Sequence, residues 1–141
     1  MKDIANTPLV SIICSTYNHG LYISQCLDGF LMQKTNFPFE ILIHDDASTD
    51  NTPDIIRVYG HNHPQVIRPI YQKENKYSKK EDIFAKYQCS RVRGKYIAIC
   101  EGDDYWIDPL KLQKQIDFLE NNPDYGMIYT TSKVYNLSLI H

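Results

Sequence analysis

Short apolar runs separated by turn-forming residues are the feature that most constrains the fold of this chain. The run LVSIIC at residues 9–14 is nearly continuous and rich in β-branched side chains, which is typical of a strand covered on both faces of a parallel sheet. The runs EILI at 40–43 and YIAIC at 96–100 have the same buried character. Weaker strands are predicted at 66–71 and 127–131. These runs predict a sheet built mainly from buried strands.

Helical patterns lie between the strands. Apolar residues spaced three and four apart form one stripe after the first strand, as on an amphipathic helix. Thr52 and Pro53 supply an N-cap and a first helical residue for the next one. Because strands and helices alternate over 141 residues, the sequence predicts one α/β domain whose mainly parallel sheet is flanked by helices. The predicted helices cover residues 23–31, 53–59, 79–92 and 108–121.

The charge balance argues against a nucleic-acid partner. Fifteen Lys and Arg residues against 17 Asp and Glu give a net charge of −2, so no basic field attracts a polyanion. No apolar run approaches the roughly 18 residues of a membrane span, and the first ten residues do not resemble a signal peptide. We expect a cytoplasmic protein, with peripheral contact to the inner face of the membrane and self-association left open.

Polar residues gather directly after the predicted strands. Ligands of parallel sheets bind beyond the carboxyl ends of the strands, so these residues are the candidates for function. Tyr17 offers a flat surface for a base, although an exposed loop tyrosine is usually only surface. The candidates are Ser15, Thr16, Tyr17 and Asn18 after the first strand, Asp45 and Asp46 after the second, and Glu101, Asp103 and Asp104 after the fourth.

Four of these acids suggest a cation. If Asp45, Asp46, Asp103 and Asp104 converge at neighbouring strand ends, their like charges repel unless a positive charge intervenes. Carboxylate oxygens suit Mg²⁺ or Mn²⁺, which complete their shells with water and substrate phosphates. In the alternative interpretation the first pair forms a turn and the second a solvated loop. The turn STYNHG has neither a Walker pattern nor three spaced glycines, so a nucleotide must be held in some other way.

Three ordered segments resemble the family 2 glycosyltransferases of GT-A fold. They are PLVSIICSTYNHGLYISQCLDGFLMQ, FEILIHDDASTDNTPDII and GKYIAICEGDDYWIDPLKLQKQIDFLE. The resemblance spans residues 8–131 and implies a nucleotide-sugar-binding domain that is incomplete at its C-terminus. Residues 1–7 then form an N-terminal tail, and 132–141 lead toward an acceptor-binding half that the chain lacks.

The resemblance also implies roles for individual residues. Tyr17 would stack on the base, Ser15 would line the pocket, and Asp46 would accept a hydrogen bond from a pyrimidine ring nitrogen. Asp103 would approach the ribose or a metal-bound water, and Asp104 would bind Mn²⁺ or Mg²⁺. The chain departs from the family pattern at Ser15, where proline is usual, and in lacking the Ala-Arg-Asn-type helix before the fourth strand, so no phosphate-binding arginine is assigned.

The implied activity is transfer of a sugar from a nucleoside diphosphate sugar, UDP-linked, to a saccharide or lipid-linked acceptor in polysaccharide or cell-surface glycan synthesis. The alternative is a truncated, non-catalytic module that binds nucleotide and metal. A nucleotidyltransferase is a weaker third reading, because the chain has no glycine-rich, basic triphosphate loop. The acids at 117, 120 and 124 lie on or after a helix expected to be peripheral, which leaves the catalytic base unassigned.

Overall fold

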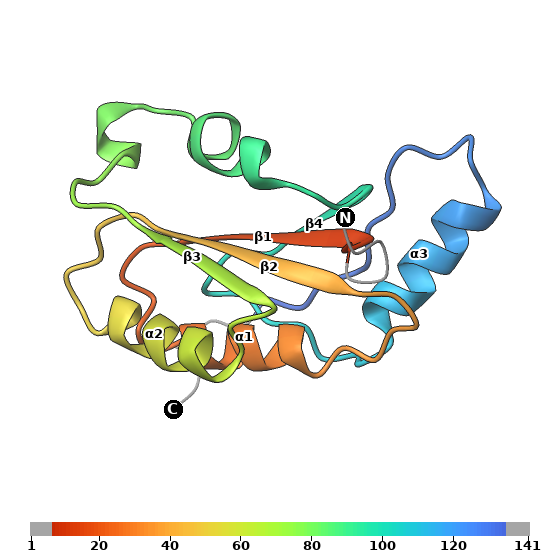
Figure 1. Cartoon of the computed structure of the whole chain (residues 1–141), viewed down its shortest axis with the longest axis horizontal. Coiled ribbons are helices and arrows are strands. Elements are labelled where there is room, and N and C mark those ends of the chain that lie inside the picture. Colours follow the sequence, from red (N-terminus) through yellow and green to blue (C-terminus); the bar gives the residue numbers. More distant parts are fainter. Residues whose placement is uncertain (1–6, 135–141) are drawn as a thin grey trace.

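A four-stranded parallel sheet forms the centre of the computed structural model, which describes residues 7–134 (Figure 1). The strand order is β3-β2-β1-β4, and every pairing is parallel. This confirms the predicted fold class. The regular elements are β1 (Val10–Thr16), α1 (Ile23–Leu31), β2 (Phe39–Asp45), α2 (Thr52–Asn62), β3 (Ile67–Tyr71), β4 (Tyr96–Ile99) and α3 (Lys111–Asn121).

The hydrophobic core lies between one face of the sheet and the helices α1 and α2, which cover that face side by side (Figure 1). Alternate residues of β1 and β2 point into it, as the two-residue period of a strand requires. Helix α3 adds Leu112 and Ile116 to the same cluster. Residues 77–91 cover the opposite face, so β1 and β2 are buried on both sides, as the continuous apolar runs predicted. Within residues 7–134, no helix is long and apolar enough to cross a bilayer.

The segment on the opposite face is irregular, so the prediction of a regular helix over 79–92 was wrong. It consists of a 3₁₀ turn at Tyr77–Lys79, a π turn at Phe84–Gln88 and a 3₁₀ turn at Cys89–Arg91. Two adjacent residues hold it against the sheet. Tyr87 stacks on His44 with ring centroids 5.3 Å apart, and the buried Gln88 amide donates to the carbonyl of Leu42 at 3.0 Å. These contacts override the weak helical periodicity of this segment.

The buried carboxylate of Glu40 holds the strands together near the end of the sheet at which they begin. Glu40 of β2 is 1% exposed and accepts hydrogen bonds from the Ser11 hydroxyl at 2.7 Å and the Arg93 backbone N–H at 3.0 Å. The guanidinium groups of Arg68 and Arg93 also pair with it, at 3.1 Å and 2.9 Å. One side chain thereby joins β1, β2, β3 and the segment that leads into β4.

Strand β4 is an edge strand and not the fully buried strand that its apolar run predicted. Tyr96 and Ala98 pack toward the core, whereas Ile97 and Ile99 are 44% and 66% exposed on the opposite face.

No strand follows β4 within the described residues, so the prediction of a strand at 127–131 was also wrong. A strand forms only when its backbone groups find a partner, and this stretch pairs with none of the four described strands. Residues 1–6 and 135–141, which include most of the predicted tail and C-terminal lead, lie outside the described residues.

Candidate functional site

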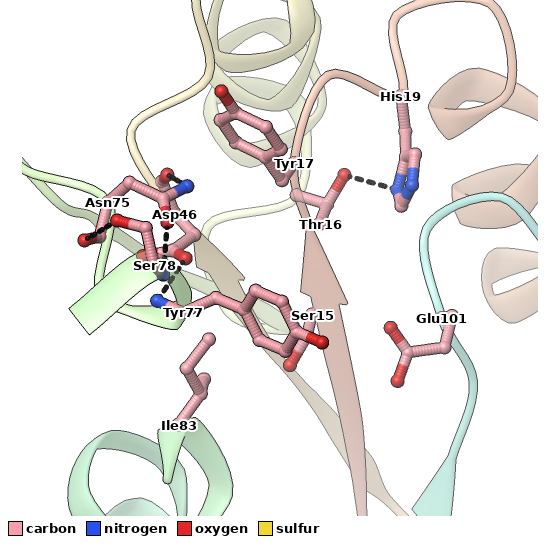
Figure 2. Close-up of a pocket in the computed structure, with 10 residues that line it drawn as sticks. All are labelled: Ser15, Thr16, Tyr17, His19, Asp46, Asn75, Tyr77, Ser78, Ile83 and Glu101. Atoms are coloured by element: carbon pink, nitrogen blue, oxygen red, sulfur yellow. Dashed lines mark hydrogen bonds between the residues drawn. The ribbon is translucent and has the colours of Figure 1, made fainter. Parts of the chain in front are cut away.

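A pocket of about 440 Å³ opens at the carboxyl ends of the strands (Figure 2). Its size is in the range of small-molecule sites, and its position is the one expected for ligands of a parallel sheet. Loops after β1, β2, β3 and β4 all contribute to it. The lining residues are Ser15, Thr16, Tyr17, His19, Asp46, Asn75, Tyr77, Ser78, Ile83 and Glu101.

The loop after β1 is fixed to the loop after β2 through Asn18. The backbone of Asn18 adopts a left-handed conformation with φ of 52°. Its side-chain oxygen accepts the backbone N–H of Thr49 at 2.8 Å, and its own N–H donates to the Ser48 hydroxyl at 2.9 Å. Tyr17 is therefore held on a defined loop although its side chain is 44% exposed. The predicted pocket residues Ser15 and Tyr17 both line the cavity.

Asp46 also lines the cavity and is buried, with 2% exposure. Its two carboxylate oxygens accept the backbone N–H groups of Lys76 at 2.7 Å and Tyr77 at 2.9 Å. The Asn75 amide donates to the Asp46 carbonyl at 3.0 Å. Each carboxylate oxygen can accept more than one hydrogen bond, so this carboxylate retains acceptor capacity toward the pocket while it holds the turn after β3.

Asp45 has a structural role, as the turn interpretation stated. Its carboxylate accepts the hydroxyl of Ser48 at 2.6 Å and the Ser48 backbone N–H at 3.2 Å. The expectation that four acids converge was wrong, because β1 lies between β2 and β4. Strands lie about 4.8 Å apart, so the acids after β2 and after β4 are separated by roughly twice that spacing.

The loop after β4 packs closely on the end of β1. The Gly102 N–H donates to the Ser15 carbonyl at 3.0 Å. His19 bonds the Thr16 hydroxyl at 2.9 Å through Nδ1, and its Nε2 lies 3.8 Å from the Asp103 carboxylate. Asp103 and Asp104 are exposed on this loop beside the pocket but do not line it.

The carboxylates of this loop repel one another. Partial burial raises the pKa of Glu101, and the negative charges of Asp103 and Asp104 raise it further, against the opposing effect of His19. Among residues 7–134, no three His, Cys, Asp or Glu side chains form a group that could hold a metal by themselves. Mg²⁺ and Mn²⁺ are commonly held by one or two carboxylates together with substrate phosphates, so the donor set fits a divalent cation bound jointly with a phosphorylated ligand.

Several lining residues were not assigned a role from the sequence. Glu101 is the second residue after β4 and was named among the polar residues at the strand ends, but no role was assigned to it. His19 lies within the loop whose polar character was noted. Nothing in the sequence marks Tyr77, because it reaches the pocket through a contact with Asp46, 31 residues away.

Comparisons with known proteins agree with this architecture. A family model described as "Glycosyl transferase family 2" matches residues 11–137. The uncharacterized protein Rv1520 of Mycobacterium tuberculosis is 47% identical over 89% of this chain, which covers 35% of that relative. The putative teichuronic acid biosynthesis glycosyltransferase TuaG of Bacillus subtilis is 34% identical over 79% of this chain and 42% of its own length. The chain thus spans 35% and 42% of the lengths of these two curated relatives.

Solved structures give the same picture. A mannosyltransferase of Pyrobaculum calidifontis, PcManGT, in complex with GDP-Man and Mn²⁺, aligns with a TM-score of 0.66 at 26% identity, covering 79% of this chain and 32% of that one. S. aureus TarS in complex with UDP-GlcNAc aligns with a TM-score of 0.67 at 25% identity, covering 81% and 32%. These likenesses confirm the expected GT-A fold.

Proposed function

The chain belongs to the family 2 glycosyltransferases, and on that premise we propose that its pocket binds a UDP-linked sugar. The observation that carries the proposal is the presence of Tyr17 and Asp46 in one pocket at the carboxyl edge of the sheet, beside an acidic loop. In this proposal Tyr17 stacks on the base, Ser15 lines the base pocket, and Asp46 accepts from the ring N–H. The complexes of TarS with UDP-GlcNAc and of PcManGT with GDP-Man support a nucleotide-sugar donor.

The loop after β4 binds the diphosphate end of the donor with a divalent cation, Mn²⁺ or Mg²⁺. Asp104 would hold the cation, and Asp103 would approach the ribose or a metal-bound water. When bound, such a cation supplies Lewis-acid stabilisation of the departing nucleotide. Two features support these roles: the raised pKa of Glu101, to which burial contributes most and the charges of Asp103 and Asp104 also contribute, and the Mn²⁺ in the PcManGT complex. His19 faces Asp103 from the β1 loop, with its Nε2 3.8 Å from the carboxylate.

The acceptor is a saccharide or lipid-linked glycan, and residues 8–131 are the donor-binding domain. The role of TuaG in teichuronic acid biosynthesis supports an acceptor of this class. An acceptor hydroxyl needs a general base within roughly 3 Å of its proton. Among the described acids, Asp117 and Glu120 lie on α3 and Asp124 follows it. None of these three acids lines the pocket. The second candidate function is a nucleotide- and metal-binding module that does not transfer sugar by itself.

Calorimetric titration tests the proposal. We expect UDP to bind clearly better with Mn²⁺ or Mg²⁺ than with excess chelator, because its phosphates otherwise face Asp103 and Asp104 uncompensated. The variant Asp104→Ala should lose the metal dependence, whereas Asp124→Ala, which removes an exposed acid outside the pocket, should behave like the parent. Equal UDP affinity with and without metal refutes the cation site.

Donor turnover separates the two candidate functions. The chain as a binding module hydrolyses UDP-sugar slowly at most and transfers nothing to added glycan. Multiple-turnover transfer to a defined acceptor would establish the enzyme and direct the search for the base to Glu101, the other carboxylate besides Asp46 that lines the pocket.

A further inference from the structure

We propose that Tyr77 is the second aromatic face of the pocket and packs on the nucleotide base opposite Tyr17. This inference rests on the nucleotide-binding function proposed above and adds a residue that the sequence did not identify. Tyr77 lies on the turn after β3, whereas Tyr17 lies on the loop after β1. Both side chains line the same cavity, together with Asp46 (Figure 2).

The turn that carries Tyr77 is fixed by hydrogen bonds at both ends. The Asp46 carboxylate accepts the N–H groups of residues 76 and 77, at 2.7 Å and 2.9 Å. Within the turn, the Asn75 side chain accepts the Ser78 N–H at 2.7 Å, and the Tyr77 carbonyl accepts the Lys80 N–H at 2.9 Å. Lys80 closes the turn in a left-handed conformation with φ of 60°. The backbone of Tyr77 is therefore positioned before any ligand binds.

The ring of Tyr77 is not used to hold the fold together. It is 78% exposed, and within the described residues its side chain makes no hydrogen bond and no aromatic ring contact. A large exposed aromatic on a fixed turn is a common feature of binding sites, because two side-chain torsions are all that a ligand must immobilise. Substitution at this position should consequently leave the stability of the domain unchanged.

The arrangement of the pocket indicates a planar ligand between the two tyrosines. In Figure 2 the Tyr77 ring extends from the turn after β3 over Ser15, Tyr17 extends from the loop after β1, and Asp46 lies beside the turn that carries Tyr77. A base placed between the rings presents an edge to the Asp46 carboxylate, which accepts from a ring N–H. Stacking on two faces and one acceptor at the edge describe a site for a nucleobase better than one for a sugar.

The test compares matched variants of the 141-residue chain by calorimetry with UDP and, as a base-free probe, pyrophosphate, both with Mn²⁺. We expect Tyr77→Ala to weaken UDP binding roughly 5- to 150-fold, the equivalent of the 1–3 kcal/mol measured per stacked base, and to leave pyrophosphate binding unchanged. Tyr77→Phe keeps the ring and should bind UDP like the parent. Tyr129→Ala removes a tyrosine that is 85% exposed outside the pocket and is the control.

Proton NMR of the bound UDP gives a second readout. Rings on both faces should shift the uracil H5 and H6 resonances upfield in the parent, and Tyr77→Ala and Tyr17→Ala should each remove part of that shift. The inference is overturned if Tyr17→Ala weakens UDP binding while Tyr77→Ala does not, and the proposed function then stands. It is also overturned if Tyr77→Ala weakens pyrophosphate as much as UDP. A parent chain that binds no nucleotide overturns both proposals.

Discussion

Replacing Gly102 by alanine tests whether the acidic loop must pack directly on the end of β1. A Cβ atom at this position would lie 2.6 Å from the Thr16 hydroxyl oxygen, 2.8 Å from the Thr16 Cβ and 2.8 Å from His19 Nδ1. These distances are shorter than non-bonded carbon contacts, whose optimum is about 3.5–4.0 Å. The loop cannot simply move away, because the Gly102 N–H is bonded to the Ser15 carbonyl at 3.0 Å.

The expected cost follows from overpacking a buried position, about 1–3 kcal/mol in the free energy of unfolding. Gly126→Ala is the matched control, since nothing lies within 4 Å of its added Cβ, and it should stay within about 0.5 kcal/mol of the parent. The double variant Thr16→Ala/Gly102→Ala should be no more stable than Gly102→Ala. Its first substitution removes the hydroxyl but leaves a Cβ atom at residue 16, 2.8 Å from the added Cβ.

The assay is urea unfolding of the parent and the three variants, followed by UDP titration with Mn²⁺ on each folded sample. Displacement of the loop moves Asp103 and Asp104 relative to the end of β1, so Gly102→Ala should also lose metal-dependent UDP affinity while still folded. If Gly102→Ala unfolds at the same urea concentration as Gly126→Ala and binds UDP equally well, the close packing of this loop does not position the acids.

Two further predictions concern buried titratable groups. Burial by itself would raise the pKa of Glu40, but hydrogen bonds from Ser11, Arg93 and Arg68 hold it below its usual range. Glu40→Gln should therefore lower the free energy of unfolding by about 1–3 kcal/mol at pH 7. This difference from the parent should shrink as the pH falls below about 4.3. An unchanged difference at low pH contradicts the assignment. Burial lowers the pKa of His44, so the neutral ring is favoured in the fold and stability should fall as the pH drops below about 6.5. His44→Phe should flatten that part of the stability profile in urea melts at several pH values, and an identical profile would show that the histidine does not contribute.

The sheet was predictable where local pattern and long-range packing agree. The runs at 9–14 and 40–43 are apolar on both faces of their strands because both faces are covered, so pattern alone identified β1 and β2. The run at 96–100 looks the same in sequence, yet one face of β4 is exposed. An apolar run shows that its side chains favour burial. It does not show whether another part of the chain covers both faces of the strand.

The site was predictable where it follows directly from strand ends. Ser15 lies near the end of β1, Tyr17 and Asp46 come straight after β1 and β2, and all three line the pocket. Residues 75–83 complete the pocket from a segment whose lysine-rich sequence resembles a solvated surface. The position of this segment is set by hydrogen bonds to Asp46, about 30 residues away in the sequence. The local spacing of apolar residues cannot predict such long-range contacts.

Asp46 explains how the proposed nucleotide pocket forms without a glycine-rich loop. In a phosphate-binding loop, backbone N–H groups point at the ligand. Here the N–H groups of the turn after β3 point instead at a buried carboxylate of the protein, at 2.7 Å and 2.9 Å. These hydrogen bonds satisfy the N–H groups of the turn and hold the turn in place. The turn therefore presents to the cavity the side chain of Tyr77 and not its backbone N–H. A pocket bounded by tyrosines and a carboxylate favours a base. In the proposed binding mode the phosphates then lie at the acidic loop after β4, where their charge would require a cation.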